Sequence, residues 1–525
     1  MTRSGLPSAR FVLWLTGALL LTVLLRAPWL GTPLGNDEGG LAFIAGAGRG
    51  GGPFMYGDYF IDRPPLLLAV FRLAAETSGT ATVRTIGVLA ALAGVTITAL
   101  LARAIAGARA ARFAGVLAAI LMSSVALGSV FTPAELLAVL PSTLSVLLVW
   151  RGTRDAAGRP GLLFAAGFLA ISALLVKQSF GDALLAGVAC LTATCLWHGS
   201  PRREVGLAAG AYAGGIVAAI VGVEAWEYVA AVPDGSMSYA LLGFRLDGLG
   251  ALAGSGAGLP GRFAQRLLVP LICSGFAVVL IWSVAGLRSA RADRVLIATL
   301  GAWGVGGSLG VLGGGSYWAH YLIQLIPFVA VTASIALAGA SARRARAAVA
   351  VLGACAVGGL VIGPLATTDE KSSAAAIGQA LAASARAGDT AHVLYSQADV
   401  LYYSGLADPF PYQWSLMMRA VPDARTELRA LLSSPGRPTW IVEWERPAAY
   451  GLDRSGATAR LLDRHYRHIS NACGVRVLIE KDTARAFHAP SPQACGQGTL
   501  LARGGAQPPP GAARSDALAV RSATP

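Results

Sequence analysis

The segment Gly31–Leu68, GTPLGNDEGGLAFIAGAGRGGGPFMYGDYFIDRPPLLL, is the stretch on which the prediction of the fold depends. It follows the first strongly apolar segment and carries an adjacent carboxylate pair, Asp37 and Glu38. Its second half contains the run Tyr59-Phe60-Ile61-Asp62-Arg63-Pro64-Pro65. Only 13% of the residues in the chain are charged, so a loop this rich in Asp, Glu, Arg and Tyr indicates a functional site at the end of an apolar helix.

The composition of the whole chain is that of a membrane protein. Hydrophobic residues make up 54% of the 525 residues, and many of them fall in long apolar runs, which predicts a polytopic α-helical membrane protein rather than a set of soluble domains. The net charge of +14 comes almost entirely from arginine. These arginines lie between apolar runs, so they indicate membrane orientation and not nucleic-acid binding.

We predict about eleven transmembrane helices. The first apolar run is too long for the core of a signal peptide, so we interpret it as a membrane span. The predicted spans cover residues 11–30, 84–102, 113–130, 135–150, 162–176, 183–197, 205–223, 267–287, 295–312, 321–338 and 347–365.

Alternate threading of these spans places the arginine-rich connections on one side. By the positive-inside rule that side is the cytoplasm, which makes the chain a multi-pass cell-membrane protein with a cytoplasmic N-terminus and an extracytoplasmic C-terminus. The outer side then receives the first loop, 31–83, with an interfacial helix at 64–76. It also receives the connections 131–135, 177–179, 224–266 and 313–324.

The chain changes character after the last predicted span. We predict a transmembrane domain at 1–366, a small extracytoplasmic α/β domain at 367–495 and a disordered tail at 496–525. The predicted helices of the α/β domain are 374–387, 424–432 and 457–465, and its predicted strands are 391–395, 439–443 and 475–479.

Two of the six cysteines lie in this outer domain. Cys473 and Cys495 are its only cysteines, and an oxidising compartment favours a disulfide between them. The other cysteines lie in apolar spans, and no Cys/His metal spacing occurs, so no metal site is predicted.

The first loop resembles that of the GT-C glycosyltransferases, in particular the family that contains protein O-mannosyltransferases and the lipid A aminoarabinose transferase. Asp37-Glu38 and the run from Tyr59 to Pro65 carry the resemblance. Three further places resemble the family: Arg84, Lys177-Gln178, and His320-Tyr321-Leu322-Ile323-Gln324-Leu325-Ile326-Pro327. The chain departs from the family at Gly40, where many relatives have arginine, and at Pro133-Ala134-Glu135, where many have Thr-Asp.

The resemblance implies transfer of a sugar from a polyprenyl-phosphate donor to an envelope glycan, lipid or protein at the outer face, with inversion. No other cofactor and no divalent metal is implied. An attacking hydroxyl needs a general base, and the resemblance gives this role to Asp37; the alternative is that Asp37 only caps a helix beginning near Gly39. Glu38 is the second catalytic candidate, or else a solvated loop residue.

Basic and aromatic residues are the candidates for substrate binding, because a leaving lipid phosphate needs fixed cations. Each has a structural alternative: an ion pair for Asp62, interfacial snorkelling for the arginines, a helix-dipole contact for Glu135 and an aromatic belt for the His-Tyr pair. The substrate-binding candidates are Asp62, Arg63, Arg84, Glu135, Lys177, His320 and Tyr321.

Two other functions stay open from the sequence. A transporter or flippase of a lipid-linked saccharide would use intramembrane charges, and an inactive assembly protein could keep the same fold. The sequence does not identify the sugar, the acceptor, the oligomeric state or the role of the outer domain.

Overall fold

The computed structural model describes residues 9–47, 56–77, 79–154, 159–198, 202–253, 259–367 and 369–496. Contacts divide the chain into two compact units. The first comprises the described residues of 1–32, 41–366 and 416–422, and the second those of 33–40, 367–415 and 423–496. Apart from Gly496, the predicted tail 496–525 lies outside the described residues.

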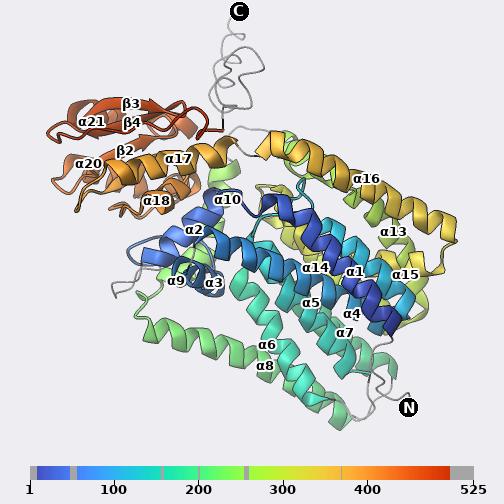
Figure 1. Cartoon of the computed structure of the whole chain (residues 1–525). Coiled ribbons are helices and arrows are strands. Elements are labelled where there is room, and N and C mark those ends of the chain that lie inside the picture. Colours follow the sequence, from blue (N-terminus) through green and yellow to red (C-terminus); the bar gives the residue numbers. More distant parts are fainter. Residues whose placement is uncertain are drawn as a thin grey trace, which may run out of the picture. The chain divides into compact units, whose positions relative to one another are not determined.

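The first unit is built of helices (Figure 1). Their order along the chain is α1 (Ala9–Arg26), α2 (Asn36–Ala47), α3 (Pro65–Ala75), α4 (Thr80–Leu121), α5 (Ala134–Gly152), α6 (Pro160–Val176), α7 (Asp182–His198), α8 (Arg202–Val229), α9 (Ser236–Ser238), α10 (Phe244–Ala253), α11 (Leu259–Phe263), α12 (Val269–Cys273), α13 (Phe276–Ser289), α14 (Arg294–Gly313), the 3₁₀ helix η6 (Ala319–Leu325), α15 (Ile326–Gly339) and α16 (Ala342–Thr367). The first residues of α2, up to Gly40, belong to the second unit.

Among the described residues, 7 helices are long and apolar enough to cross a membrane, or up to 8 if one bent pair counts as a span. The shorter α6 and α7 are also apolar. The helix α4 contains the span predicted at 84–102 and the first half of the span predicted at 113–130, with an interruption at Gly107 between them. Every predicted span therefore falls at least partly on helix, and the predicted fold class is confirmed.

Two predicted spans differ in detail. The span predicted at 113–130 ends early, because α4 stops at Leu121. Arg26, which is almost fully buried, donates hydrogen bonds to the carbonyl groups of Met122 (2.9 Å), Ser129 and Phe131 (3.0 Å), so the guanidinium replaces helical donors in this turn. The span predicted at 267–287 is bent by 77° where α12 meets α13.

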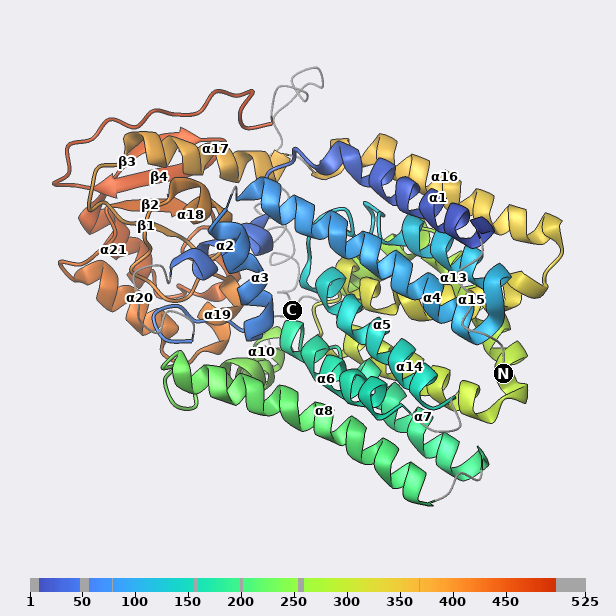
Figure 2. The same ribbon diagram turned by 60° about the horizontal axis from the view of Figure 1, so that its bottom comes forward.

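The second unit contains a four-stranded sheet (Figure 2). Its strands are β1 (Ala391–Val393), β2 (Trp440–Glu443), β3 (Tyr466–Ala472) and β4 (Val475–Glu480), in the order β1-β2-β4-β3. β1 pairs in parallel with β2, with Ala391 opposite Trp440, and the other pairs are antiparallel. Its helices are α17 (Asp369–Ser384), α18 (Asp399–Ser404), α20 (Ala424–Ser433) and α21 (Ala457–His465). The short helix α19 (Ser415–Ala420) begins at the last residue of one segment of this unit, and its other residues belong to the first unit.

The strand β3 was not predicted. Its sequence, YRHISNA, is mostly polar, and the middle residues of this edge strand are exposed or half-buried. By contrast β1 and β2 are buried along their whole length, and apolar residues make up most of each.

The structure joins Cys473 and Cys495 by a disulfide, with the Cα atoms 5.3 Å apart. We predict that the Cys473→Ser/Cys495→Ser variant loses about 2 to 4 kcal/mol of stability in the outer domain, because the unfolded chain is no longer cross-linked. Thermal unfolding of the two forms would measure this. Free alkylation of both thiols in the non-reduced protein would contradict the bridge.

The orientation of the chain in the membrane stays a prediction. Phosphatase and fluorescent-protein fusions placed after Leu365 would test it. We expect an active phosphatase and a dark fluorescent protein, because the rule for positive residues puts this end outside the cytoplasm. The reverse pattern would refute the orientation.

Candidate active site

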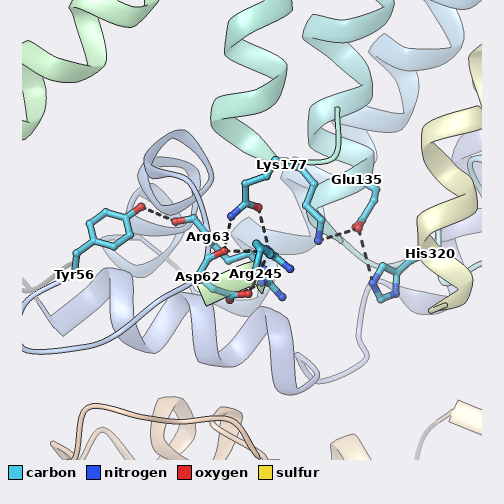
Figure 3. Close-up of polar contacts among 8 residues, drawn as sticks. Tyr56, Asp62, Arg63, Glu135, Lys177, Arg245 and His320 are labelled. Atoms are coloured by element: carbon cyan, nitrogen blue, oxygen red, sulfur yellow. Dashed lines mark hydrogen bonds and ion pairs between the residues drawn. The ribbon is translucent and has the colours of Figure 1, made fainter. Parts of the chain in front are cut away.

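Five segments that are far apart in the sequence bring charged side chains together in the first unit (Figure 3). They are the loop before α3, the first turn of α5, the residue after α6, the first turn of α10, and η6. The charged members, which we call the polar cluster, are Asp62, Arg63, Glu135, Lys177, Arg245 and His320.

One half of the polar cluster is centred on Asp62. This buried carboxylate forms ion pairs with Arg63 and with Arg245, the latter at 3.2 Å. Gln178 donates to the Asp62 carbonyl at 2.7 Å and accepts from Arg245 at 3.2 Å. Burial by itself would raise the pKa of Asp62, but the charges of Arg63, Arg245 and Lys177 outweigh it and lower that pKa. Asp62 is therefore an anion that orients two guanidinium groups.

The other half is centred on Lys177. Its ammonium lies 3.0 Å from a Glu135 oxygen, and both side chains are buried. The His320 ring nitrogen Nε2 is 3.9 Å from the same oxygen. The ammonium also lies 5.4 Å from the centre of the Tyr321 ring, within the range of a cation–π contact. The predicted residues Glu135, Lys177, His320 and Tyr321 therefore meet.

The turn that presents Lys177 is fixed by close packing against α14. Gln324 of η6 donates to the Ser179 carbonyl at 2.9 Å. A Cβ atom on Gly310 of α14 would lie 2.4 Å from that same carbonyl oxygen, so only glycine lets the turn approach so closely. The position of the ammonium thus depends on a backbone contact outside the polar cluster.

We predict that Gly310→Ala pushes this turn away from α14. The change should lower the melting temperature of the protein and move the Lys177 ammonium from its position beside Glu135. A matched control exists in the same helix, because a Cβ atom on Gly301 would meet nothing within 4 Å. Differential scanning fluorimetry of Gly310→Ala and Gly301→Ala in detergent compares them. Equal melting temperatures for the two variants would show that the packing is not tight.

The predicted residue Arg84 occupies a different environment. It is buried near the start of α4, donates to the Thr32 carbonyl at 3.3 Å and lies 5.1 Å from the centre of the Phe131 ring. These contacts tie the first loop to the turn before α5. They give Arg84 a structural role, and phosphate contact by this residue stays a prediction.

The carboxylate pair lies in the first turn of α2. The helix begins at Asn36 and not near Gly39, so Asp37 is already inside it and is not its N-cap. Asp37 is exposed and has no hydrogen-bond or ion-pair partner among the described residues. Glu38 is buried and accepts from the Gly35 N–H at 3.1 Å, so it is not a solvated loop residue. Roles in catalysis for either residue stay predictions.

The departure at Gly40 has a steric reason within the second unit. A Cβ atom there would lie 2.6 Å from the Trp414 ring and 2.9 Å from the Ala398 methyl group. The arginine that many relatives have at this position does not fit. The contacts of Gly40, and the hydrogen bond from the Ala398 N–H to Asn36 (3.0 Å), explain why residues 33–40 group with the second unit.

Two functional candidates were missed from the sequence. Arg245 is the only basic residue between Arg203 and Arg262. A single charge in so long a stretch without other basic residues indicates a functional or buried position, and the sequence therefore offered a sign of this residue. Asp182 is buried at the start of α7, where its carboxylate accepts from the Trp303 indole at 3.0 Å and from Ser142 at 3.2 Å. Ser142 belongs to α5 and Trp303 to α14, so Asp182 is a buried carboxylate held between three helices.

The charges of the polar cluster do not cancel. Arg63, Lys177 and Arg245 supply three positive charges against the two negative charges of Asp62 and Glu135, which leaves one positive charge with His320 neutral. A guanidinium has five N–H donors, and the buried Nε of Arg245 has no hydrogen-bond partner among the described residues. The polar cluster can therefore accept an anion without breaking its ion pairs.

The comparisons with known proteins give the fold. No family model and no curated protein matches the chain. Among solved structures, ArnT from Cupriavidus metallidurans in the apo state has a TM-score of 0.60 at 18% identity, over 89% of this chain and 97% of that one. The same protein bound to undecaprenyl phosphate has a TM-score of 0.56 at 18% identity over the same shares of the two chains.

A second likeness is to the Archaeoglobus fulgidus oligosaccharyltransferase tethered with an acceptor peptide. Its TM-score is 0.53 at 12% identity, over 92% of this chain and 74% of that one. Together these likenesses confirm the predicted fold of the GT-C glycosyltransferase superfamily. At such identities they show the fold alone.

Proposed function

We propose that the chain is an integral-membrane glycosyltransferase that moves a sugar from a polyprenyl-phosphate donor to an acceptor of the cell envelope at the extracytoplasmic face. The observation that carries the proposal is the polar cluster, a set of cations held by two buried carboxylates, with a surplus of positive charge, in a chain with the GT-C fold. The solved ArnT structure with undecaprenyl phosphate adds support, because it shows that this fold accommodates a lipid phosphate.

The donor phosphate would contact Arg63, Lys177 and Arg245. Asp62 and Glu135 hold these cations in fixed directions before the donor binds, so less side-chain freedom is lost on binding. When the glycosidic bond to the phosphate breaks, negative charge grows on the phosphate oxygens. Fixed cations stabilise this charge more strongly than water does, and they need no proton transfer.

The acceptor hydroxyl must lose its proton as it attacks the anomeric carbon. Asp37 is our candidate for the general base, on the strength of the family resemblance of Asp37-Glu38 and of its exposed carboxylate, which has no partner among the described residues. A single displacement by the acceptor inverts the configuration of the anomeric carbon. His320 and Tyr321 border the Lys177 ammonium and are candidates for sugar contacts.

The alternative of a transporter has one observation in its favour. Asp182 is a buried carboxylate next to the predicted span 183–197, and ionisable groups inside the membrane are functional in many transporters. However, Trp303 and Ser142 each donate to this carboxylate, which suits a packing role between α5, α7 and α14. The polar cluster, by contrast, is formed at helix ends and loops, as a transferase site requires.

Analysis of the cell envelope tests the proposal. Mass spectrometry of envelope glycans, lipids and proteins from a deletion strain should show the loss of one sugar from one acceptor, and the gene supplied in trans should restore it. Intact acceptors together with a lipid-linked saccharide trapped on the inner face would favour a flippase instead.

A further inference from the structure

The second unit contains a basic hollow of about 480 Å³ at the C-terminal end of α17. Three arginines line it, together with a histidine, a serine and three alanines. The lining residues are Ala383, Ser384, Arg386, Arg467, Ala484, Arg485, Ala486 and His488, and none of them is acidic. We call this feature the arginine hollow.

The wall of the arginine hollow is held in place by the segment after β4. The His488 N–H donates to Ser384 Oγ at 3.1 Å, and the Phe487 ring lies 6.0 Å from the Trp440 ring. Further along, Ser373 donates to the Cys495 carbonyl at 3.1 Å, and Cys495 is joined to Cys473. The shape of the hollow is therefore built into the fold.

The guanidinium groups of the hollow retain donors for a ligand. Arg467 donates to the Thr483 carbonyl at 3.1 Å, and Arg485 pairs with Asp389 at 3.4 Å. The Arg386 guanidinium has no hydrogen-bond or ion-pair partner among the described residues. Since each guanidinium carries five N–H groups in a planar fork, the three together suit the oxygens of phosphate or carboxylate.

The three positive charges of the arginine hollow do not reflect a general excess of positive charge in residues 369–496. Residues 369–496 contain 12 Arg and 2 Lys against 13 Asp and Glu, so 14 positive charges minus 13 negative charges leave a net charge of only +1. A nearly neutral domain has thus gathered three arginines around one hollow. The structural alternative is that basic side chains stabilise the negative C-terminal end of α17. One arginine is enough for that role.

We propose that the arginine hollow binds the phosphate or carboxylate groups of an acidic saccharide. The volume matches a small ligand site, and the lining offers charged donors but no large apolar side chain for a lipid tail. If the chain is a transferase as proposed, this ligand is part of its acceptor. The binding itself does not depend on that function, and it is tested without sugar transfer.

Calorimetric titration of the full-length protein in nanodiscs of zwitterionic lipid tests the proposal. The probes are trigalacturonate for carboxylate, glucose 6-phosphate for phosphate and maltotriose as the uncharged control. We expect at least one acidic probe to bind, and maltotriose not to bind. Arg386→Gln/Arg467→Gln should weaken that binding by about tenfold or more, because two charge-assisted contacts are lost.

Two matched variants separate the hollow from general charge. Arg446→Gln/Arg464→Gln removes the same charge from exposed positions of the same unit and should leave binding unchanged. Arg425→Gln/Arg454→Gln alters another hollow that is lined by arginines and should also leave it unchanged. Arg485 stays unaltered in all variants because it pairs with Asp389, and melting temperatures verify folding.

Three results would overturn the proposal. The first is that neither acidic probe binds. The second is that a control variant loses as much affinity for the probe as Arg386→Gln/Arg467→Gln does. The third is that Arg386→Gln/Arg467→Gln keeps its affinity for the acidic probes and loses affinity only for vesicles that contain phosphatidylglycerol. The last result would assign the hollow to a lipid headgroup. None of them would bear on sugar transfer, so the proposed function would still stand or fall on its own test.

Discussion

Asp37→Asn is expected to insert and fold like the parental protein and to lose sugar transfer by about 10²- to 10⁴-fold, the usual contribution of a general base. The amide keeps the shape of the carboxylate but removes its basicity. Because Asp37 is exposed and has no hydrogen-bond partner among the described residues, the exchange leaves no buried group unpaired. Asp37→Glu should retain slight activity, since its carboxylate is displaced by one methylene group.

The matched control for this prediction is Asp58→Asn. Asp58 is an exposed aspartate of the same loop, and no partner is found for it among the described residues. Rates are compared in proteoliposomes with the identified donor and acceptor. If Asp37→Asn turned over at nearly the rate of Asp58→Asn, Asp37 would not be the base, and the search would move to Glu38, Asp62 and Glu135.

Neutral replacement of Lys177 should raise the apparent KM for the donor by about tenfold to a hundredfold, because a charge-assisted contact to the phosphate is lost. The apparent KM for the acceptor should change little. Lys177→Gln alone would leave Glu135 buried without its partner, which is itself destabilising. The cleaner variant is therefore Glu135→Gln/Lys177→Gln, in which both charges disappear together.

The same measurement applies to Arg63. Arg63→Lys should be milder than Arg63→Ala, since a charge remains although the planar fork is lost. Parental donor affinity in both Glu135→Gln/Lys177→Gln and Arg63→Ala would exclude these cations as phosphate ligands. A loss of donor affinity in a variant with a normal melting temperature would separate binding from folding.

The sequence allowed much of the polar cluster to be predicted. Glu135 and Lys177 lie at the ends of predicted spans, and Asp62 and Arg63 precede the predicted interfacial helix. Alternate threading already places their connections on one side of the membrane. Charged residues at such positions are few in a chain with 13% charged residues, so each stood out. The contacts in the structure bring these four residues together, as that threading implies.

Other features depend on packing that has no local pattern. Arg245 reaches Asp62 from a connection of more than 40 residues, and nothing in its neighbours indicates that α10 leads there. The early end of α4 depends on Arg26, nearly 100 residues earlier, whose donors satisfy three carbonyl groups of the following turn. The edge strand β3 lacks an apolar face, so its sequence does not distinguish it from a loop.

Purified protein in proteoliposomes tests the central claim most directly. Polyprenyl-phosphate donors carrying mannose, aminoarabinose or arabinofuranose are supplied with an envelope extract from the deletion strain, and free polyprenyl phosphate and glycosylated acceptor are both quantified by mass spectrometry. We predict that one donor yields equal amounts of the two products, that Asp37→Asn yields almost none, and that Glu135→Gln/Lys177→Gln yields less than the parental protein at low donor concentration. Translocation of a lipid-linked sugar without any release of polyprenyl phosphate would contradict it.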